Sequence, residues 1–304
     1  MKKWICFFSL FILSYSLYAQ TDFWKSKHAY LGQKLPGEKP EIFAKGLLVD
    51  SGIAFCRVAF SNDGRDFFYT FAKHWFDYKG SGTNHIVFDG KQWQQPILMA
   101  KELAIPTLSI DGKSLYLAGR KGQLWKVEKI NENWGTPYKY LDLPYGLYNF
   151  MPTQSGNFYV GSNGNQGNKD DYSTYQFSIL TMKDKDTTIE SLGTPLNKPG
   201  FNGDFYIAPD ESYMIISTNE TTDYKSELYI SFRKEDKTWT KPLSLGDDIN
   251  KGEAHRFGQY VSPDGKYLFY TWGTSEKDTN IYWLRFDNRL KRLRQLANHR
   301  ETKP

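Results

Sequence analysis

The sequence predicts an all-β fold, a β-propeller of five four-stranded blades, and three observations support this prediction. A turn motif centred on Asp-Gly or a related pair recurs five times between apolar, aromatic-rich segments. A second motif, Trp-x-x-Pro, follows the turn in three of these repeats. Successive turns are separated by 48, 44, 55 and 54 residues, which is the length of a propeller blade and exceeds that of a leucine-rich or tetratricopeptide repeat.

The turn motif predicts the two inner strands of each blade. Asp-Gly between apolar runs supplies the positive φ angle and the Asx hydrogen bond that a hairpin reversal requires. We therefore interpret Asp63, Asp111, Asp210 and Asp264 as turn formers rather than as catalytic carboxylates. The five segments are FSNDGRDFFYTF from residue 60, LSIDGKSLYLAG from 108, PTQSGNFYVGS from 152, IAPDESYMIIST from 207 and VSPDGKYLFYTW from 261.

The Trp-x-x-Pro motif predicts the start of the outer strand, because proline is tolerated at strand starts and an indole can cover the neighbouring sheet. The motif occupies residues 93–96, 134–137 and 239–242, and Leu-Gly-Thr-Pro replaces it at residues 192–195. A third strand lies between the two motifs in each repeat. These third strands are expected at residues 85–88, 123–127, 175–179, 227–230 and 280–283.

The two ends of the repeat region predict how the ring closes. Residues 40–48 have the pattern of an outer strand with no blade before it, and the last blade lacks the Trp-x-x-Pro motif. Pairing the N-terminal strand with the last blade would remove two exposed sheet edges. Five blades follow from this count. Six blades remain an alternative if residues 290–296 form a further strand rather than a tail or a short helix.

The first residues predict export from the cytoplasm. Lys2 and Lys3 precede an apolar run and a small-residue exit that ends at Ala19, which is the pattern of a cleaved signal peptide. We therefore divide the chain into a signal peptide, 1–19, a leader segment, 20–39, the propeller, 40–289, and a basic C-terminal tail, 290–304. No later run reaches the roughly 20 apolar residues of a membrane helix, so we expect a periplasmic or secreted protein without a transmembrane segment.

Composition narrows the functional classes. Without Lys2 and Lys3 the chain carries 37 basic and 34 acidic residues, spread along its length, which does not indicate nucleic-acid binding. Five cationic side chains within residues 285–294 indicate a solvated terminus or an anchor for an anionic surface. Cys56 is the only cysteine after the signal peptide and lies in an apolar stretch, so we expect a core residue and no disulfide.

Motifs of catalysis and cofactor binding are missing from the sequence. It contains no HExxH, GxSxG, GxxxxGK[ST] or paired-cysteine motif, and we expect no catalytic residue, metal or cofactor on this basis. The loop GSNGNQGNKDD from residue 161 could offer oxygen ligands to calcium, but it also fits an ordinary connecting loop. The ligands would come from Asn165, Asn168, Asp170 and Asp171.

The repeats carry a resemblance to a known family. Ser-Pro-Asp-Gly at residues 262–265, followed by Lys-Tyr-Leu-Phe-Tyr, resembles the WD-repeat-like unit of TolB-like β-propellers over about residues 30–286. The strings YLGQKLPGEKPEIFAKG, ELYISFRKEDKTWTKPLSLGDDIN and NIYWLRF resemble exported single-propeller proteins of Bacteroidetes type. The resemblance implies a scaffold for protein interactions. The pattern departs in the third repeat, where Gln154-Ser-Gly replaces Pro-Asp-Gly, and in the fourth, where Glu211 replaces glycine, and we expect the third blade to be irregular.

Propellers bind ligands at the mouth of the central channel, so the innermost strands predict a site. Alignment of these strands places Arg57, Ile105, Asn149, Asp204 and Gly258 at equivalent positions. Polar residues at or just before these positions form our candidate binding set: Arg57, Glu102, Tyr148, Asn149, Asn202, Asp204, His255 and Arg256. Residues 74–78, His-Trp-Phe-Asp-Tyr, are a second candidate that either contacts a ligand or packs on a neighbouring blade.

Three functions are compatible with this sequence. The first is a monomeric scaffold that binds an unidentified protein of the cell envelope. The second is a propeller that binds a glycan or another small molecule, motivated by the aromatic content of 17% and the polar channel mouth. The third is a lyase, lactonase or glycosidase with Glu102, Asp204, His255 and Arg256 as its catalytic group, and the missing motifs disfavour it.

Overall fold

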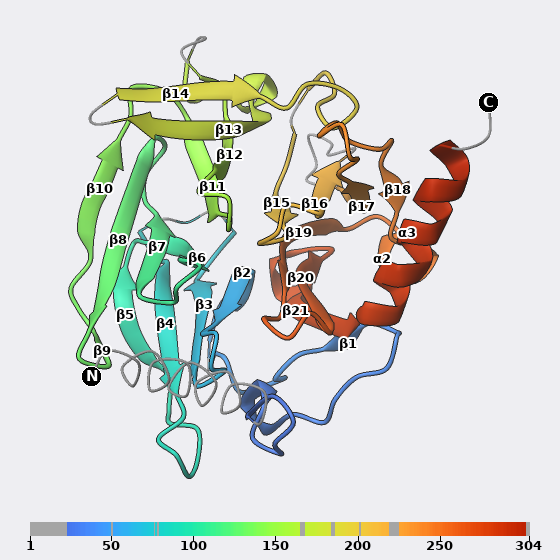
Figure 1. Ribbon diagram of the computed structural model, residues 1–304. Coiled ribbons are helices and arrows are strands. Elements are labelled where there is room, and N and C mark those ends of the chain that lie inside the picture. The colour runs from blue at the N-terminus through green and yellow to red at the C-terminus, as the bar shows by residue number, and fades with distance from the viewer. Residues whose placement is uncertain are drawn as a thin grey trace, which may run out of the picture.

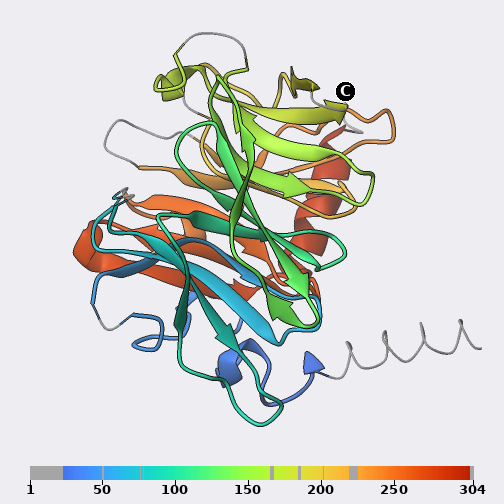
Figure 2. The same cartoon turned by 90° about the vertical axis from the view of Figure 1, so that its left-hand side faces the viewer.

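Five antiparallel sheets surround a central axis and form a closed β-propeller (Figures 1 and 2). The computed structural model describes residues 23–49, 51–75, 77, 79–164, 168–183, 186–200, 202–218 and 225–301. The predicted signal peptide and its cleavage site lie outside the described residues. The all-β propeller with five four-stranded blades, predicted from the repeats, is confirmed.

Each blade runs from an inner to an outer strand. Blade 1 contains β2 Ile53–Phe60, β3 Asp66–Ala72, β4 Gly82–Val87 and β5 Ile97–Lys101. Blade 2 contains β6 Ala104–Leu108, β7 Ser114–Ala118, β8 Gln123–Ile130 and β10 Tyr138–Asp142, and the short β9 Asn133–Trp134 pairs with β8. Blade 3 contains β11 Leu147–Pro152, β12 Phe158–Ser162, β13 Gln176–Lys183 and β14 Asp186–Ser191.

The last two blades and the helices complete the ring. Blade 4 contains β15 Phe205–Ile207, β16 Tyr213–Thr218, β17 Glu227–Phe232 and β18 Leu243–Ser244. Blade 5 contains β19 His255–Val261, β20 Tyr267–Gly273, β21 Thr279–Arg285 and, from the beginning of the chain, β1 Glu41–Ile42. The helices are η1 Tyr30–Gly32, η2 Tyr172–Thr174, α2 Asp247–Asn250, η3 Glu276–Asp278 and α3 Asp287–Glu301. No described helix is long and apolar enough to cross a membrane.

The repeated aspartates form the turns between the inner strands. A side-chain oxygen of Asp63, Asp111, Asp210 or Asp264 accepts a hydrogen bond from the backbone N–H two residues later, at 3.0 to 3.2 Å. This bond is an Asx turn, which fixes the reversal without help from the rest of the protein. Our interpretation of the four aspartates as turn formers is therefore consistent with the structure.

The two turns that depart from the repeat pattern contact each other. Glu211 stands where other blades have glycine and has a φ of 59°. Its buried carboxylate accepts hydrogen bonds from Thr153 (2.7 Å), from Asn157 (3.0 Å) and from Ser155, and it pairs with Arg233. Ser155 belongs to the irregular turn of blade 3. Hydrogen bonds between the two irregular turns therefore connect blades 3 and 4.

The beginning of the chain closes the ring. Glu41 and Ile42 of β1 pair with Trp283 and Tyr282 of β21 in antiparallel register, which confirms the predicted closure (Figure 1). The paired strand is shorter than the predicted residues 40–48, because the chain turns away after Phe43. The Phe43 ring is buried and packs against Trp283, with centroids 4.9 Å apart. Burial of this ring at the junction of blades 5 and 1 stabilises the closed form.

The leader segment is also part of the folded structure. Tyr30 is fully buried, and its hydroxyl donates a hydrogen bond to the carboxylate of Asp264 at 2.7 Å. Trp24 packs against Phe60 and donates from Nε1 to the carbonyl oxygen of Asn62 at 3.1 Å. These contacts hold the segment against the turns of blades 1 and 5.

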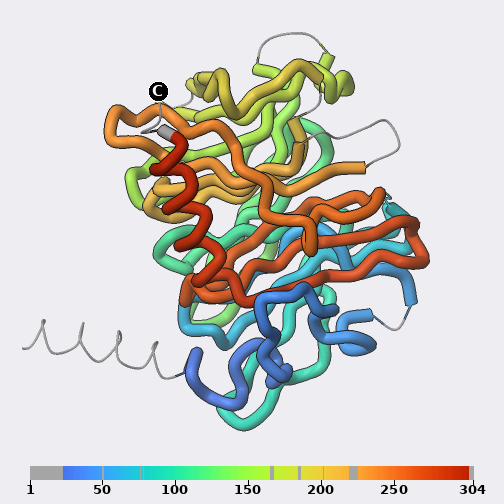
Figure 3. The backbone as a smooth tube through the Cα atoms, turned by 90° about the vertical axis from the view of Figure 1, so that its right-hand side faces the viewer, coloured from blue at the N-terminus to red at the C-terminus, as the bar shows by residue number. Residues whose placement is uncertain are grey.

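The residues that we expected to form a basic tail belong mostly to helix α3, which lies along blade 4 (Figure 3). Leu293 and Ala297 are buried at helical spacing, so this segment forms no sixth blade. Two of its arginines contact other elements of the protein. Arg289 pairs with Asp248, and the Arg294 guanidinium lies 4.8 Å from the centroid of the Phe232 ring.

Candidate functional site

A β-bulge interrupts the innermost strand in four blades. The register shifts in β2, β6, β11 and β19, and one residue in each shift has a left-handed backbone. These residues are Cys56, Ile105, Asn149 and Gly258, with φ angles of 61°, 56°, 53° and 65°. Bulges bend a strand and redirect its side chains. Three of the five positions that aligned in the sequence, Ile105, Asn149 and Gly258, are therefore bulge residues, and Arg57 directly follows the bulge residue Cys56.

Arg57 joins four blades at the axis. Its side chain is fully buried, and its guanidinium donates to the Thr107 hydroxyl at 3.0 Å, to the Gln259 carbonyl oxygen at 3.3 Å and to the Phe205 carbonyl oxygen. Burial lowers the pKa of Arg57 to about 10, although the nearby negative charge of Asp204 opposes this effect. Arg57 is therefore charged at neutral pH, and its hydrogen bonds connect blade 1 to three other blades.

Asp204 extends this network to the remaining blade. One carboxylate oxygen accepts from the Asn149 amide at 2.6 Å, and the other accepts from the Gly258 backbone N–H at 2.9 Å. The Gln259 amide also contacts the Asp204 carbonyl oxygen at 3.4 Å. The structure thus brings together Arg57, Asn149 and Asp204, in one hydrogen-bond network that contains residues of all five blades. We name this set, with Thr107 and Gln259, the axial network.

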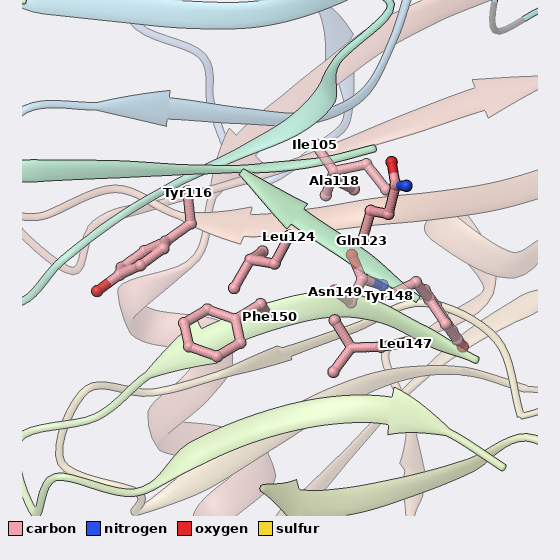
Figure 4. A pocket seen from close by; sticks show the side chains of 9 residues that line it. All are labelled: Ile105, Tyr116, Ala118, Gln123, Leu124, Leu147, Tyr148, Asn149 and Phe150. Atoms are coloured by element: carbon pink, nitrogen blue, oxygen red, sulfur yellow. The ribbon is translucent and has the colours of Figure 1, made fainter. Parts of the chain in front are cut away.

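Tyr148 and Asn202 organise the entrance to blade 4. The Tyr148 hydroxyl contacts the carbonyl oxygens of Asn202 and Gly203, each at 2.6 Å. The buried Asn202 side chain bonds the backbone of Tyr175 and Lys198 at 2.9 to 3.0 Å. Figure 4 shows Tyr148 beside Asn149 in the crevice between blades 2 and 3, which is too narrow for a water molecule. The hydrogen bonds of Tyr148 and Asn202 therefore hold loop backbone in place.

Arg256 fixes the loop that leads into blade 5. Its buried guanidinium donates to five backbone carbonyl groups, at 2.6 to 3.1 Å. Burial lowers the pKa of Arg256. The adjacent His255 is also buried, and its ring stacks on Phe257 with centroids 4.1 Å apart. The Arg256 guanidinium thus caps the carbonyl groups of the loop that leads into blade 5.

The two loops singled out in the sequence make contacts within the protein. Trp75 donates from Nε1 to the Thr279 hydroxyl of blade 5 at 2.8 Å, and His74 lies 3.1 Å from Glu276. Phe76 and Tyr78 lie outside the described residues. In the other loop, Asp170 pairs with Lys121 at 2.8 Å, whereas Asn165 is not described. Among the described residues, no group of three or more His, Cys, Asp or Glu residues is placed to hold a metal.

Glu102 lies in a different place, a groove between blades 1 and 2. The groove has a volume of about 380 Å³. We name it the blade 1–2 groove and define it by Met99, Lys101, Glu102, Arg120, Gln123, Trp125 and Pro137, which line it with their neighbours. Sequence reasoning missed the groove, because its two walls come from different repeats and only the packing of these repeats forms the space between them.

A buried charge cluster between blades 1 and 2 was also missed. The Asp66 carboxylate is buried and contacts His85 Nε2 at 2.7 Å, Lys129 Nζ at 3.2 Å and Trp134 Nε1 at 3.3 Å. Burial by itself would raise the pKa of Asp66, but the hydrogen bond and the charge of His85, together with the charge of Lys129, hold it below its usual range. Trp134 belongs to a Trp-x-x-Pro motif and packs edge-on against Phe68, so its indole covers the neighbouring blade as the motif predicted.

Because Asp66 is stabilised as a carboxylate, Asp66→Asn is expected to lower the free energy of unfolding by about 2 kcal/mol at neutral pH. The folded-state pKa is below the unfolded value, so this stabilisation is present above about pH 4 and is lost as the pH falls through the folded pKa. Urea unfolding of both proteins at several pH values should show the difference shrinking in acid. A difference that stays constant down to pH 3 would contradict this prediction.

The geometry defines the class of this protein as a closed five-bladed β-propeller whose axis is occupied by a polar network. No protein-family model matches the sequence, and no curated protein matches it at a significant level. Similarity to solved structures concerns the fold. TolB from Acinetobacter baumannii matches with 11% identity and a TM-score of 0.44, over 75% of this chain and 53% of TolB.

Two further solved structures are similar in the same way. The periplasmic gluconolactonase PpgL of Pseudomonas aeruginosa matches with 12% identity and a TM-score of 0.42, over 72% of this chain and 65% of PpgL. The β-propeller domain of Cps50 (Swd1) from Myceliophteria thermophila matches with 10% identity and a TM-score of 0.41, over 74% and 64% of the two chains. This chain thus covers less than two thirds of each of the three structures.

Proposed function

We propose that this protein is an exported scaffold that binds a protein partner in the cell envelope through the outer strands of blades 1 and 2. One observation carries the proposal. Ile97 and Leu98 of β5 are 59% and 56% exposed, and Tyr138 and Tyr140 of β10 are 42% and 36% exposed. We name these four residues the outer patch; β5 and β10 lie on the same side of the ring (Figure 1). Exposed apolar side chains gathered on neighbouring elements indicate an interaction surface.

The interior of the ring supports a scaffold in a second way. Arg57, Asp204 and Arg256 use their charged groups in bonds within the protein. Such ties hold the blades in one arrangement, so a partner can bind without first ordering the surface that it contacts. The signal-peptide pattern of residues 1–19 supports a partner outside the cytoplasm.

The test compares three forms of the mature chain in a pull-down from the native cell envelope, with a glycan array in parallel. The first is wild type, the second carries Ile97→Asp and Tyr138→Asp, and the third carries Leu296→Asp on α3. Leu296 is 52% exposed on another side of the ring, so it is a matched control. Equal melting temperatures of the three forms establish that all are folded.

The proposal predicts a protein that wild type and the Leu296 variant retain and the outer-patch variant loses. We expect at least a tenfold loss, because fully burying a large apolar side chain contributes about 1.5–3 kcal/mol and a few central residues carry most of the binding energy of an interface. Equal capture by all three forms, or a glycan signal without a protein partner, would overturn the proposal.

A further inference from the structure

The blade 1–2 groove has room for a small ligand. Its volume of about 380 Å³ falls within the range of small-molecule sites in proteins. One wall comes from the end of β5 and the turn after it, with Met99, Lys101 and Glu102. The other wall comes from blade 2, with Arg120 and Trp125 among its members. The site is therefore separate from the axial network.

Both walls of the groove are held in place by hydrogen bonds and side-chain packing. The Glu102 backbone N–H donates to the Ser81 carbonyl oxygen at 2.9 Å, and the Thr83 hydroxyl donates to the Leu103 carbonyl oxygen at 2.8 Å. On the other wall the Trp125 indole packs directly over Gly119, where an added Cβ would lie 2.6 Å from Nε1. The groove is thus formed before a ligand arrives, which lowers the entropic cost of binding.

The groove contains three charged side chains. Lys101 and Arg120 are exposed, and neither forms an ion pair with another described residue. Glu102, which also lines the groove, forms none in this part of the chain either. Met99, Trp125 and Pro137 supply apolar surface beside these groups. The groove therefore offers two cations, one carboxylate and an apolar wall to a guest.

We propose that the blade 1–2 groove binds a small carboxylate that also carries N–H or O–H donors. The ligand carboxylate pairs with Arg120 and Lys101, since guanidinium and ammonium groups bind carboxylates well. A hydroxyl or ammonium group of the ligand donates to Glu102. A compact apolar face packs against Trp125. A sugar acid and a free amino acid share this chemistry.

Binding to the mature chain is measured by calorimetry and by ligand-observed NMR with D-glucuronate and L-leucine. D-Glucose and L-leucinamide, which lack the carboxylate, are the matched controls. The variants are Arg120→Gln and Lys101→Gln, and Lys241→Gln on blade 4 is the control for the loss of an exposed cation. All three side chains are on the surface, so unchanged melting temperatures are expected.

We expect at least one of the two carboxylates to bind, with affinity at least tenfold weaker in Arg120→Gln and unchanged in Lys241→Gln. Binding of glucuronate alone identifies a sugar acid, and binding of leucine alone identifies an amino acid. The proposal is overturned if neither carboxylate binds at millimolar concentration, if the controls without a carboxylate bind equally well, or if Arg120→Gln leaves the affinity unchanged. This outcome is independent of the outer patch, which the groove variants retain.

Discussion

Arg57→Ala is expected to lower the free energy of unfolding by about 3–5 kcal/mol, the range found when one member of a buried charged network is removed. The substitution leaves the carbonyl oxygens of Phe205 and Gln259 without their donor and the Asp204 carboxylate without a nearby cation. Each unpaired buried polar group costs about 1–3 kcal/mol. The effect is large because one side chain joins blades 1, 2, 4 and 5.

Urea unfolding at neutral pH, followed by tryptophan fluorescence, measures this effect. The matched control is Arg65→Ala, which removes an exposed arginine that lies 5.8 Å from the ring centroid of Phe23. The control should cost less than about 1 kcal/mol. If both variants lose the same small stability, the axial network does not hold the ring together.

Gly258→Ala is expected to destabilise the protein by about 3 kcal/mol or more. Gly258 has a φ of 65°, and an added Cβ would lie 2.3 Å from the Cys56 carbonyl carbon and 2.7 Å from the Arg57 backbone N. These atoms are backbone and cannot rotate away. Blades 5 and 1 must therefore separate where the ring closes, and the bond from the Gly258 N–H to Asp204 must weaken.

Gly265→Ala isolates the effect of that close approach. Gly265 has a similar φ of 72°, but nothing lies within 4 Å of an added Cβ. In this control only the strain of a positive φ angle at alanine lowers the free energy of unfolding, by about 1 kcal/mol. A loss of stability at Gly258 no greater than that at Gly265, in the same urea experiment, would contradict a tight contact between blades 5 and 1.

The repeats were enough to predict the blades, because strand, turn and Asx hydrogen bond are local properties of each unit. The alignment also placed Asn149 and Asp204 at equivalent positions of the inner strands, and the structure brings the two side chains to 2.6 Å from each other. It could not reveal that Arg57 is fully buried with partners from three other blades. Alignment gives a position in the repeat, whereas the bulge at Cys56 decides where the next side chain points.

Contacts between different blades were the part that the sequence did not reveal. Asp66 bonds Lys129 and Trp134, which lie 63 and 68 positions away, and these two pairs exist only because blade 2 packs on blade 1. The groove beside Glu102 has the same origin. Helix α3 is a related case. The sequence interpretation relied on its many cationic residues, whereas the buried Leu293 and Ala297 determine how the helix packs.

The pairing of Glu41 with Trp283 fixes an order of events in folding. Residue 41 leaves the ribosome long before residue 283, so β1 has no partner while blades 1 to 4 are being synthesised. Contacts between such distant segments form slowly, because the intervening chain must first be ordered. Until β21 arrives, the nascent chain presents unpaired strand edges to other chains. Completion of the final sheet therefore ends the interval in which this protein is most prone to aggregate.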